Sequence, residues 1–377
     1  MISELDVIFN SYKIKYNILD KLFTENKVSI DKKEYINLYI DFDSIIRNLT
    51  AINLSELVRA GSEDEFKDHV KNTIRNTCNL IAHYRRYFTT RKRYSRIVVF
   101  LSYPFVNIPL INNMYVDDYK KYYYNTINSN DRFILKRILE EAFQFIKIII
   151  EYIEDVYFVM DNTIEHSLIP KIISSEKLND TNVNMIVTRD KFIYQYINNN
   201  FIILRPKYKE GSYLVNKNNC IEIMKNEYGI TTELNVDSDY IVYILSILGD
   251  TLRSVPKIKG VGLSKAIKVI HTSNCNKNNI LEISKVFGDK SSLIMNNYYA
   301  INIDYLYSNL TMPDKVRITN QLTDRFDNVG LSKLNDQLFT DSPINIEDLT
   351  DALRLKHCVE HPFNNNIFVK RWFLWLN

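Results

Sequence analysis

The chain has 377 residues, of which 46% are hydrophobic and 25% are charged, and this balance excludes an intrinsically disordered protein. The formal net charge is +3, so binding to nucleic acid would have to come from local basic patches rather than from an overall positive field. The four cysteines form no CxxC pair. No apolar run reaches the roughly 18 residues that a membrane span needs. We therefore expect a cytoplasmic, non-secreted protein with reduced thiols and no membrane partner.

In chain order, residues 1–36 are predicted to form a charged N-terminal extension. Short apolar segments then alternate with helical patterns, which favours an α/β domain with a mostly parallel sheet over residues 37–235. Residues 236–300 are predicted to hold two helices joined by a glycine-bearing hairpin, and residues 301–377 a helical C-terminal region. The predicted strands lie in 38–46 (ending at Asp41), 96–103, 156–160, 184–190 and 199–206, and a long helix is predicted at 131–153.

Three acids fall at or just past the ends of predicted strands. These are Asp41, Asp161 and Asp190. Because active crevices of such sheets lie at the carboxyl ends of the strands, we expect these side chains to converge. Asp41 and Asp190 are also suited to cap the helices that follow, and an isolated strand-end aspartate more often has that role.

The most informative segment is 247–270, which reads ILGDTLRSVPKIKGVGLSKAIKVI. It predicts a helix end, a Gly-Asp turn, a proline-bearing loop and a second helix that Gly260-Val261-Gly262 opens. Such a hairpin leaves backbone N–H groups bare at a helix N-terminus, where they bind a phosphate without reading a base. Lysines around it would add phosphate contacts, although lysines on a surface helix are also ordinary solvated side chains. They are Lys257, Lys259, Lys265 and Lys268.

This segment resembles the helix-hairpin-helix region of the 5′-3′ exonuclease and flap endonuclease family, whose PIN-like members usually read close to GDSSDNIPGVPGIGPKTA. The matching positions are Gly249, Asp250, Pro256, Gly260, Gly262 and Ala266. The resemblance covers roughly residues 37–270 and implies an α/β nuclease domain followed by a DNA-binding hairpin. It also implies recognition of DNA structure rather than sequence, and it leaves room for a K⁺ ion at the hairpin.

Nucleases of this family hydrolyse phosphodiesters with two divalent metals, Mg²⁺ or Mn²⁺, held by a dense carboxylate cluster. The acids that the resemblance maps onto this cluster, as catalytic groups and metal ligands, are Asp41, Asp161, Asp190 and Asp250. Lys120, in the tyrosine-rich segment 117–124, takes the place of the family's basic residue at the scissile phosphate. An ordinary surface segment explains that stretch equally well.

The motifs depart from the family pattern at several acids. Leu101 replaces the acid after the second strand, and Phe192 replaces the second acid of the fourth motif. The third motif is a Glu-Ala-Asp-Asp run at a helix start in the family. Our register places residues 159–162, Val-Met-Asp-Asn, against it, or the same stretch moved by one residue. No group for a second metal is therefore complete.

Arg253 stands where the family carries the acid partner of Asp250. Its guanidinium would repel a divalent ion, and we expect it to pair with Asp190 or Asp250 and to fill the space of a metal. Two metals are therefore not expected. One metal held by Asp41, Asp161 and Asp190 remains open, as does a chain with no metal.

Three further segments have weaker signals. Residues 83–96 interleave six cations with aromatic side chains, which suits a nucleic-acid backbone or a protein partner, but the solvated end of a helix is the favoured interpretation. His357, Cys358 and His361 lack a second Cys/His pair and are interpreted as chance rather than a metal site. The aromatic tail 371–375 is interpreted as a core-docking segment or an anchor for a partner.

These observations favour a nuclease-like protein that binds DNA or a protein assembly with little or no hydrolysis. One alternative is an active, metal-dependent 5′ nuclease that works with fewer acids. Another is a purely structural subunit of a complex. The Ile-, Asn-, Lys- and Tyr-rich composition indicates an AT-rich genome, such as that of a phage or another virus, which would place the protein in the host-cell cytoplasm.

Overall fold

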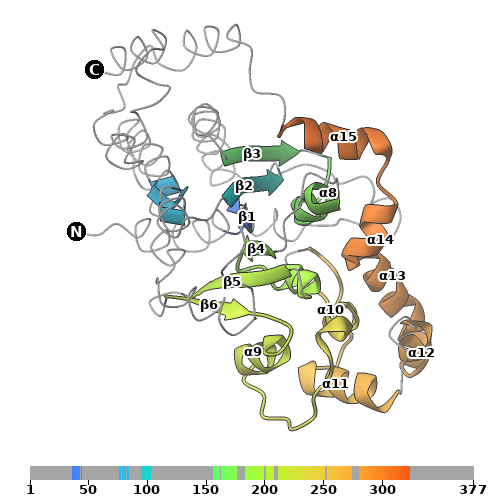
Figure 1. The fold of residues 1–377 in the computed structure, drawn as a ribbon. Helices are drawn as coiled ribbons and strands as arrows, with labels where there is room; N and C mark the ends of the chain where they lie inside the picture. Colours follow the sequence, from blue (N-terminus) through green and yellow to red (C-terminus); the bar gives the residue numbers. More distant parts are fainter. Residues whose placement is uncertain are drawn as a thin grey trace, which may run out of the picture.

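The computed structural model describes residues 36–42, 44, 76–77, 79–81, 83–84, 95–102, 156–161, 163–175, 183–198, 201–207, 211–250, 253–273 and 280–322. Within them, six strands form one sheet in the order β3-β2-β1-β4-β5-β6 (Figure 1). Strands β1 to β5 pair in parallel, and β6 runs antiparallel to β5. The strands are β1 Ile36–Asp41, β2 Ser95–Ser102, β3 Val156–Asp161, β4 Val183–Val187, β5 Phe201–Lys207 and β6 Gly211–Val215. The predicted α/β class with a mostly parallel sheet is confirmed.

Two details of the sheet differ from the prediction. Strand β4 ends at Val187 rather than at Asp190, because Asp190 caps the following 3₁₀ helix η2 (Lys191–Tyr196). The antiparallel edge strand β6 was not predicted, since its five residues form no apolar run. The predicted helix over 131–153 lies outside the described residues.

The central strands are buried on both faces. In β2, every side chain from Ile97 to Leu101 is at most 1% exposed, and Leu38, Tyr39 and Ile40 of β1 are buried to the same degree. Continuous apolar runs of this kind suit parallel strands, whose two faces are both covered in α/β folds. The sheet therefore forms a rigid base for the side chains that follow its strand ends.

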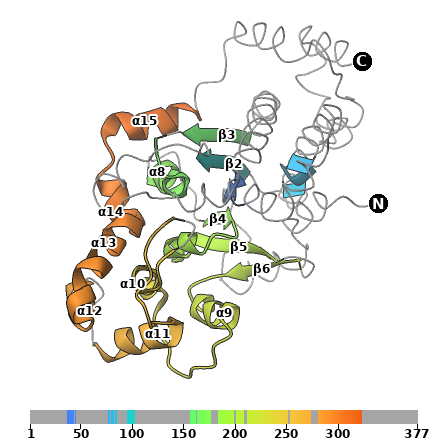
Figure 2. The same ribbon diagram turned by 180° about the vertical axis from the view of Figure 1, so that it is seen from behind.

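The helices with defined bounds in the described region all follow β3, although helical residues also occur before it, at 42, 44, 76–77, 79–81 and 83–84. In Figures 1 and 2, α11 to α15 form an arc along one side of the sheet. Among the described residues, no helix is long and apolar enough to cross a membrane. The α-helices are α8 Ile169–Ser175, α9 Cys220–Glu227, α10 Ile241–Leu248, α11 Leu263–Thr272, α12 Ile280–Lys285, α13 Ser291–Ile301, α14 Ile303–Ser308 and α15 Met312–Asn320, with 3₁₀ helices η1 His166–Leu168, η3 Ser238–Tyr240 and η4 Gly288–Lys290.

A buried asparagine fixes the loop between α10 and α11. The side-chain amide of Asn297, on α13, donates hydrogen bonds at 2.8 Å to the carbonyls of Ser246 and Pro256. Beside it, the rings of Tyr243 and Tyr298 stack with centroids 5.5 Å apart and planes 7° from parallel. Helix α13 therefore holds the end of α10 and the loop after it in one arrangement.

Gly249 makes the turn out of α10 possible. Its backbone has φ 67° and ψ 179°, a combination that only glycine adopts readily. A Cβ at this position would lie 2.6 Å from the carbonyl oxygen of Val255, which belongs to the same tight turn. The turn is closed by Asp250 and Val255, whose backbones form an antiparallel bridge. The glycine is thus required by both its dihedral angles and its close contact.

Replacing Gly249 by alanine should lower the free energy of unfolding by at least about 3 kcal/mol, because backbone strain and a clash with backbone add together. Gly229→Ala is the matched control, since Gly229 has φ 63° but open space around the added Cβ. It should cost only about 1–2 kcal/mol. Urea denaturation of the two variants measures the difference, and equal losses would contradict the crowding argument.

Candidate metal centre

Asp41 is the last residue of β1 and is fully buried. Its Oδ1 accepts a hydrogen bond from the backbone N–H of Ser44 at 3.0 Å, and its Oδ2 accepts one from the hydroxyl of Thr188 at 2.5 Å. Thr188 follows β4, which lies parallel to β1, so the carboxyl ends of two neighbouring strands meet here. The carboxylate is therefore held in one orientation at the predicted edge of the sheet.

Asp190 lies beside it. Its carboxylate caps η2 by accepting a hydrogen bond from the N–H of Phe192 at 3.0 Å, so the capping interpretation of Asp190 is confirmed. Its own N–H donates to the Thr188 hydroxyl at 2.9 Å, and Thr188 thereby links it to Asp41. The cap uses one acceptor position of a carboxylate that has several, so it does not exclude a second role.

Glu165 and His166, which the sequence reasoning missed, complete the group. Both side chains are fully buried. The Nδ1 of His166 lies 3.1 Å from Oε1 of Glu165, and its Nε2 lies 3.7 Å from Oδ1 of Asp41. One potential ligand atom each from Asp41, His166 and Asp190 lies within 4.8 Å of the other two. The third member of this group is His166, whereas Asp161, the third acid expected from the sequence, is not part of it.

The residues proposed for the third motif do not lie at a helix start. Val159, Met160 and Asp161 lie in β3, whereas the helix start that follows the strand is Glu165-His166-Ser167-Leu168. The signal in the sequence that could have identified this run is Glu165, a glutamate at the start of the helix after β3. This run begins with an acid, Glu165, and has His166 and Ser167 after it.

Arg253 is fully buried and lies among three carboxylates. Its Nη1 donates to Asp250 at 2.8 Å, its Nη2 lies 3.4 Å from Glu165, and both nitrogens contact Asp190. The guanidinium also covers the ring of Phe192, with its carbon 4.1 Å from the centroid. The predicted pairing of Arg253 with Asp190 and Asp250 is confirmed, and Glu165 is an additional partner.

Asp161 has a different environment at the end of β3. It accepts hydrogen bonds from the N–H groups of Thr163 and Ile164 at 2.7 and 2.9 Å, and Arg317 of α15 donates to it at 2.7 Å. Burial raises the pKa of Asp161, but the hydrogen bonds from Arg317 and Thr163 outweigh it and hold the pKa below its ordinary value. Its contacts fix the turn after β3 and dock α15.

The hairpin between α10 and α11 has one buried and one exposed side. Ile258, Val261 and Leu263 are buried, whereas Gly260 and Gly262 face solvent. Gly262 is the N-cap of α11, and Gly260 has φ 76°, which favours glycine. The four predicted lysines, Lys257, Lys259, Lys265 and Lys268, are all exposed.

Several predicted features lie outside the described residues. They include Lys120, the Cys/His segment at 357–361, the aromatic tail 371–375 and most of the basic run 83–96. Within that run, Tyr84 is fully buried and contacts His83 edge-on, with ring centroids 5.7 Å apart. At least Tyr84 is therefore a core residue rather than a surface for stacking bases.

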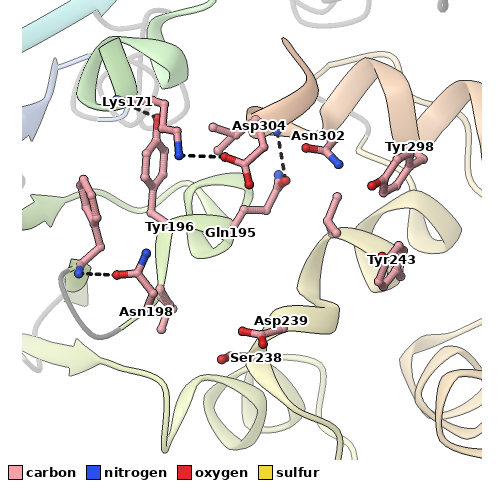
Figure 3. Close-up of a pocket in the computed structure, with 14 residues that line it drawn as sticks. Lys171, Gln195, Tyr196, Asn198, Ser238, Asp239, Tyr243, Tyr298, Asn302 and Asp304 are labelled. Atoms are coloured by element: carbon pink, nitrogen blue, oxygen red, sulfur yellow. Dashed lines mark hydrogen bonds and ion pairs between the residues drawn. The ribbon is translucent and has the colours of Figure 1, made fainter. Parts of the chain in front are cut away.

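A separate cavity of about 360 Å³ lies between α8, η2, α10, α13 and α14 (Figure 3). Lys171 and Asp304 at its wall form an ion pair at 2.9 Å, and Gln195 donates to the carbonyl of Ile301 at 3.0 Å. It shares no lining residue with the group around Arg253. Among the described residues, the group of possible metal ligands lies elsewhere, at Asp41, His166 and Asp190.

Solved structures with a similar fold come from bacteriophage T5. The T5 D15 protein co-crystallized with metal ions has 10% sequence identity and a TM-score of 0.50, over 77% of this chain and 98% of that chain. A variant of the T5 D15 flap endonuclease in a complex with DNA and metal ions has 10% identity and a TM-score of 0.49, over 77% and 97%. The zinc-bound T5 5′-exonuclease has 8% identity and a TM-score of 0.47, over 77% and 100%. No protein-family model and no curated protein matches the sequence.

The residues present do not fit a pair of divalent ions. The positive guanidinium of Arg253 lies in contact with Asp190, Asp250 and Glu165, where a second metal would need anionic oxygens. Among the described residues, the donor atoms that lie close together are those of Asp41, His166 and Asp190. These described residues offer ligands for one ion.

We expect Arg253→Met to lower the free energy of unfolding by about 3–5 kcal/mol, because it leaves buried carboxylates without their cation. Arg317→Met is the matched control. Its side chain is 43% exposed, so its loss should cost about 1 kcal/mol or less. Denaturant titrations at neutral pH measure both values. Similar losses in the two variants would contradict a central role for Arg253.

Proposed function

We propose that this chain, which has the fold of the 5′-3′ exonucleases and flap endonucleases, binds the DNA backbone without hydrolysing it. It would serve as a subunit of a nucleoprotein assembly. The observation that carries this proposal is the buried ion-paired Arg253, which stands where the family has a metal-binding acid. The exposed hairpin supplies the DNA-binding part of the proposal.

Arg253 opposes the two-metal chemistry directly. A guanidinium about 5 Å from a divalent ion, at an effective dielectric of about 20, is repelled by roughly 6–7 kcal/mol. Two-metal hydrolysis needs ions on both the attacking and the leaving oxygen. With Leu101 and Phe192 at two other acid positions of the family, and both side chains buried, nothing at these points attracts a second ion.

The hairpin offers a phosphate site that does not depend on metals. Ile258, Val261 and Leu263 anchor the loop in the core, so the exposed backbone at Gly260 and Gly262 is presented on a rigid base. Backbone N–H groups at the start of α11, together with the positive end of the helix, favour a phosphate there. Such contacts position DNA without reading its sequence.

The first test is cleavage of a labelled 5′-flap and a nicked duplex, in Mg²⁺ and in Mn²⁺. We expect no metal-dependent cutting by the wild type, because the second ion is excluded, and no difference from Asp190→Asn. Binding of the same substrates should persist in the wild type. Metal-dependent cutting that disappears in Asp190→Asn would overturn the proposal and favour an active nuclease with a sparse set of acids.

The second test concerns the hairpin lysines. In duplex DNA each neutralised phosphate contributes about 0.9 to the slope of log K against log salt, so removing two lysine contacts should reduce the slope by about 2. We expect this reduction for the double variant Lys257→Gln/Lys259→Gln. The matched control is Lys285→Gln/Lys290→Gln, which removes two exposed lysines near η4.

Fluorescence anisotropy from 50 to 300 mM salt measures both slopes. An unchanged slope in the hairpin variant, or the same change in both variants, would remove the hairpin from the DNA-binding surface. A folded wild type with no salt-dependent affinity for DNA would instead favour a purely protein-bound subunit.

A further inference from the structure

We propose that Asp41, His166 and Asp190 form a site for one divalent transition metal of the Zn²⁺ type, which binds imidazole nitrogen. The proposal goes beyond the function proposed above and does not require DNA. It also differs from an all-carboxylate site for a pair of Mg²⁺ ions. Its central residue is His166, whose position follows from the helix start after β3.

Glu165 fixes the protonation pattern of the His166 ring. A carboxylate only accepts hydrogen bonds, so the 3.1 Å contact between Nδ1 of His166 and Oε1 of Glu165 places a proton on Nδ1. In the neutral ring, the lone pair is then on Nε2. Metal-binding histidines commonly show this arrangement, in which a carboxylate orients the ring from behind. The ring also lies against Phe100, with centroids 6.1 Å apart, which restricts its rotation.

The Nε2 atom of His166 faces Asp41. Its distance from Oδ1 of Asp41 is 3.7 Å, and a ligand atom of Asp190 completes a set within 4.8 Å. Ligands of one Zn²⁺ lie about 2.0–2.2 Å from it, and therefore about 3–4 Å from each other. The three atoms need only small movements to meet one ion. In the neutral ring the Nε2 lone pair faces the Asp41 carboxylate, and a divalent ion between them would supply a positive charge that both attract.

The contacts around the three residues hold them in place for this role. Ser44 and Thr188 fix the carboxylate of Asp41, and Phe192 fixes that of Asp190. Asp190 is also close to the surface, with its side chain 7% exposed, so the site is next to solvent. Oriented ligands of this kind reduce the reorganisation that metal binding would otherwise need.

The donor set selects the class of metal. Imidazole suits Zn²⁺, Co²⁺ and similar ions, whereas Mg²⁺ prefers oxygen ligands and an octahedral shell. Arg253 shares Asp190 with the site and disfavours any cation that depends on negative charge alone. A neutral nitrogen donor is less affected by that arginine. The site should therefore bind Zn²⁺ or Co²⁺ in preference to Mg²⁺.

The test is calorimetric titration of the metal-free full chain with Zn²⁺, Co²⁺ and Mg²⁺, with no DNA present. We expect one tightly bound Zn²⁺ and Mg²⁺ binding at least about 100-fold weaker. His166→Gln should weaken Zn²⁺ by about 100-fold or more, since even the loss of a supporting partner costs 10–100-fold. The Co²⁺ form should show ligand-field absorption bands that the variant lacks.

His271→Gln is the matched control, because His271 is exposed on α11, and it should leave Zn²⁺ affinity unchanged. A second variant, His357→Gln/His361→Gln, keeps the site and should retain one equivalent of Zn²⁺. The Zn²⁺ titration of this second variant tests the proposal even if His166→Gln does not fold. Absence of saturable Zn²⁺ binding, binding that survives His166→Gln, or binding lost with His357 and His361 would each overturn the proposal. None of these outcomes would affect DNA binding at the hairpin.

Discussion

The buried contacts of Arg253 are the interaction on which the rest of the site depends. Its partners come from three separate places: Glu165 before η1, Asp190 before η2, and Asp250 after α10. The guanidinium therefore joins the carboxyl edge of the sheet to the turn that leads into the hairpin. Because removing one partner of a buried ion pair leaves an uncompensated charge, the cluster favours retention of all its members together. The position of the hairpin relative to the sheet follows from this constraint.

The contacts of Arg253 concern the side chains at the strand ends rather than the fold itself. A scaffold can retain its strand order and helix packing while the groups at its strand ends change. Here Asp190 and Asp250 pair with the side chain of Arg253. Thr188 keeps Asp41 and Asp190 linked, so the part of the site nearest β1 retains its geometry. The residues around Asp41 and those around Arg253 therefore have different charges and contacts.

Much of this arrangement could be predicted from the sequence. Apolar runs ending in acids placed Asp41 and Asp190 together, because neighbouring parallel strands bring their carboxyl ends to one edge. The pairing of Arg253 with Asp190 or Asp250 was expected from the family resemblance, which places Arg253 among these acids, together with the attraction of opposite charges. Glu165 and His166 were missed because the register of the third motif depended on Asp161, and only the end of β3 shows that the helix begins later. The role of Asp161 depends on Arg317, which is distant in sequence and has no local signal.

Helix α15, the last helix of the described region, has a consequence beyond the site. In the described sheet β3 is an edge strand, and a free edge presents unpaired backbone groups that can recruit a strand from another molecule. The side chain of Gln321, just after α15, accepts a hydrogen bond from the N–H of Met160 in β3 at 3.0 Å. Arg317 binds the adjacent Asp161. The helix thus shields an edge that would otherwise favour intermolecular strand pairing, and so contributes to keeping the chain from aggregating.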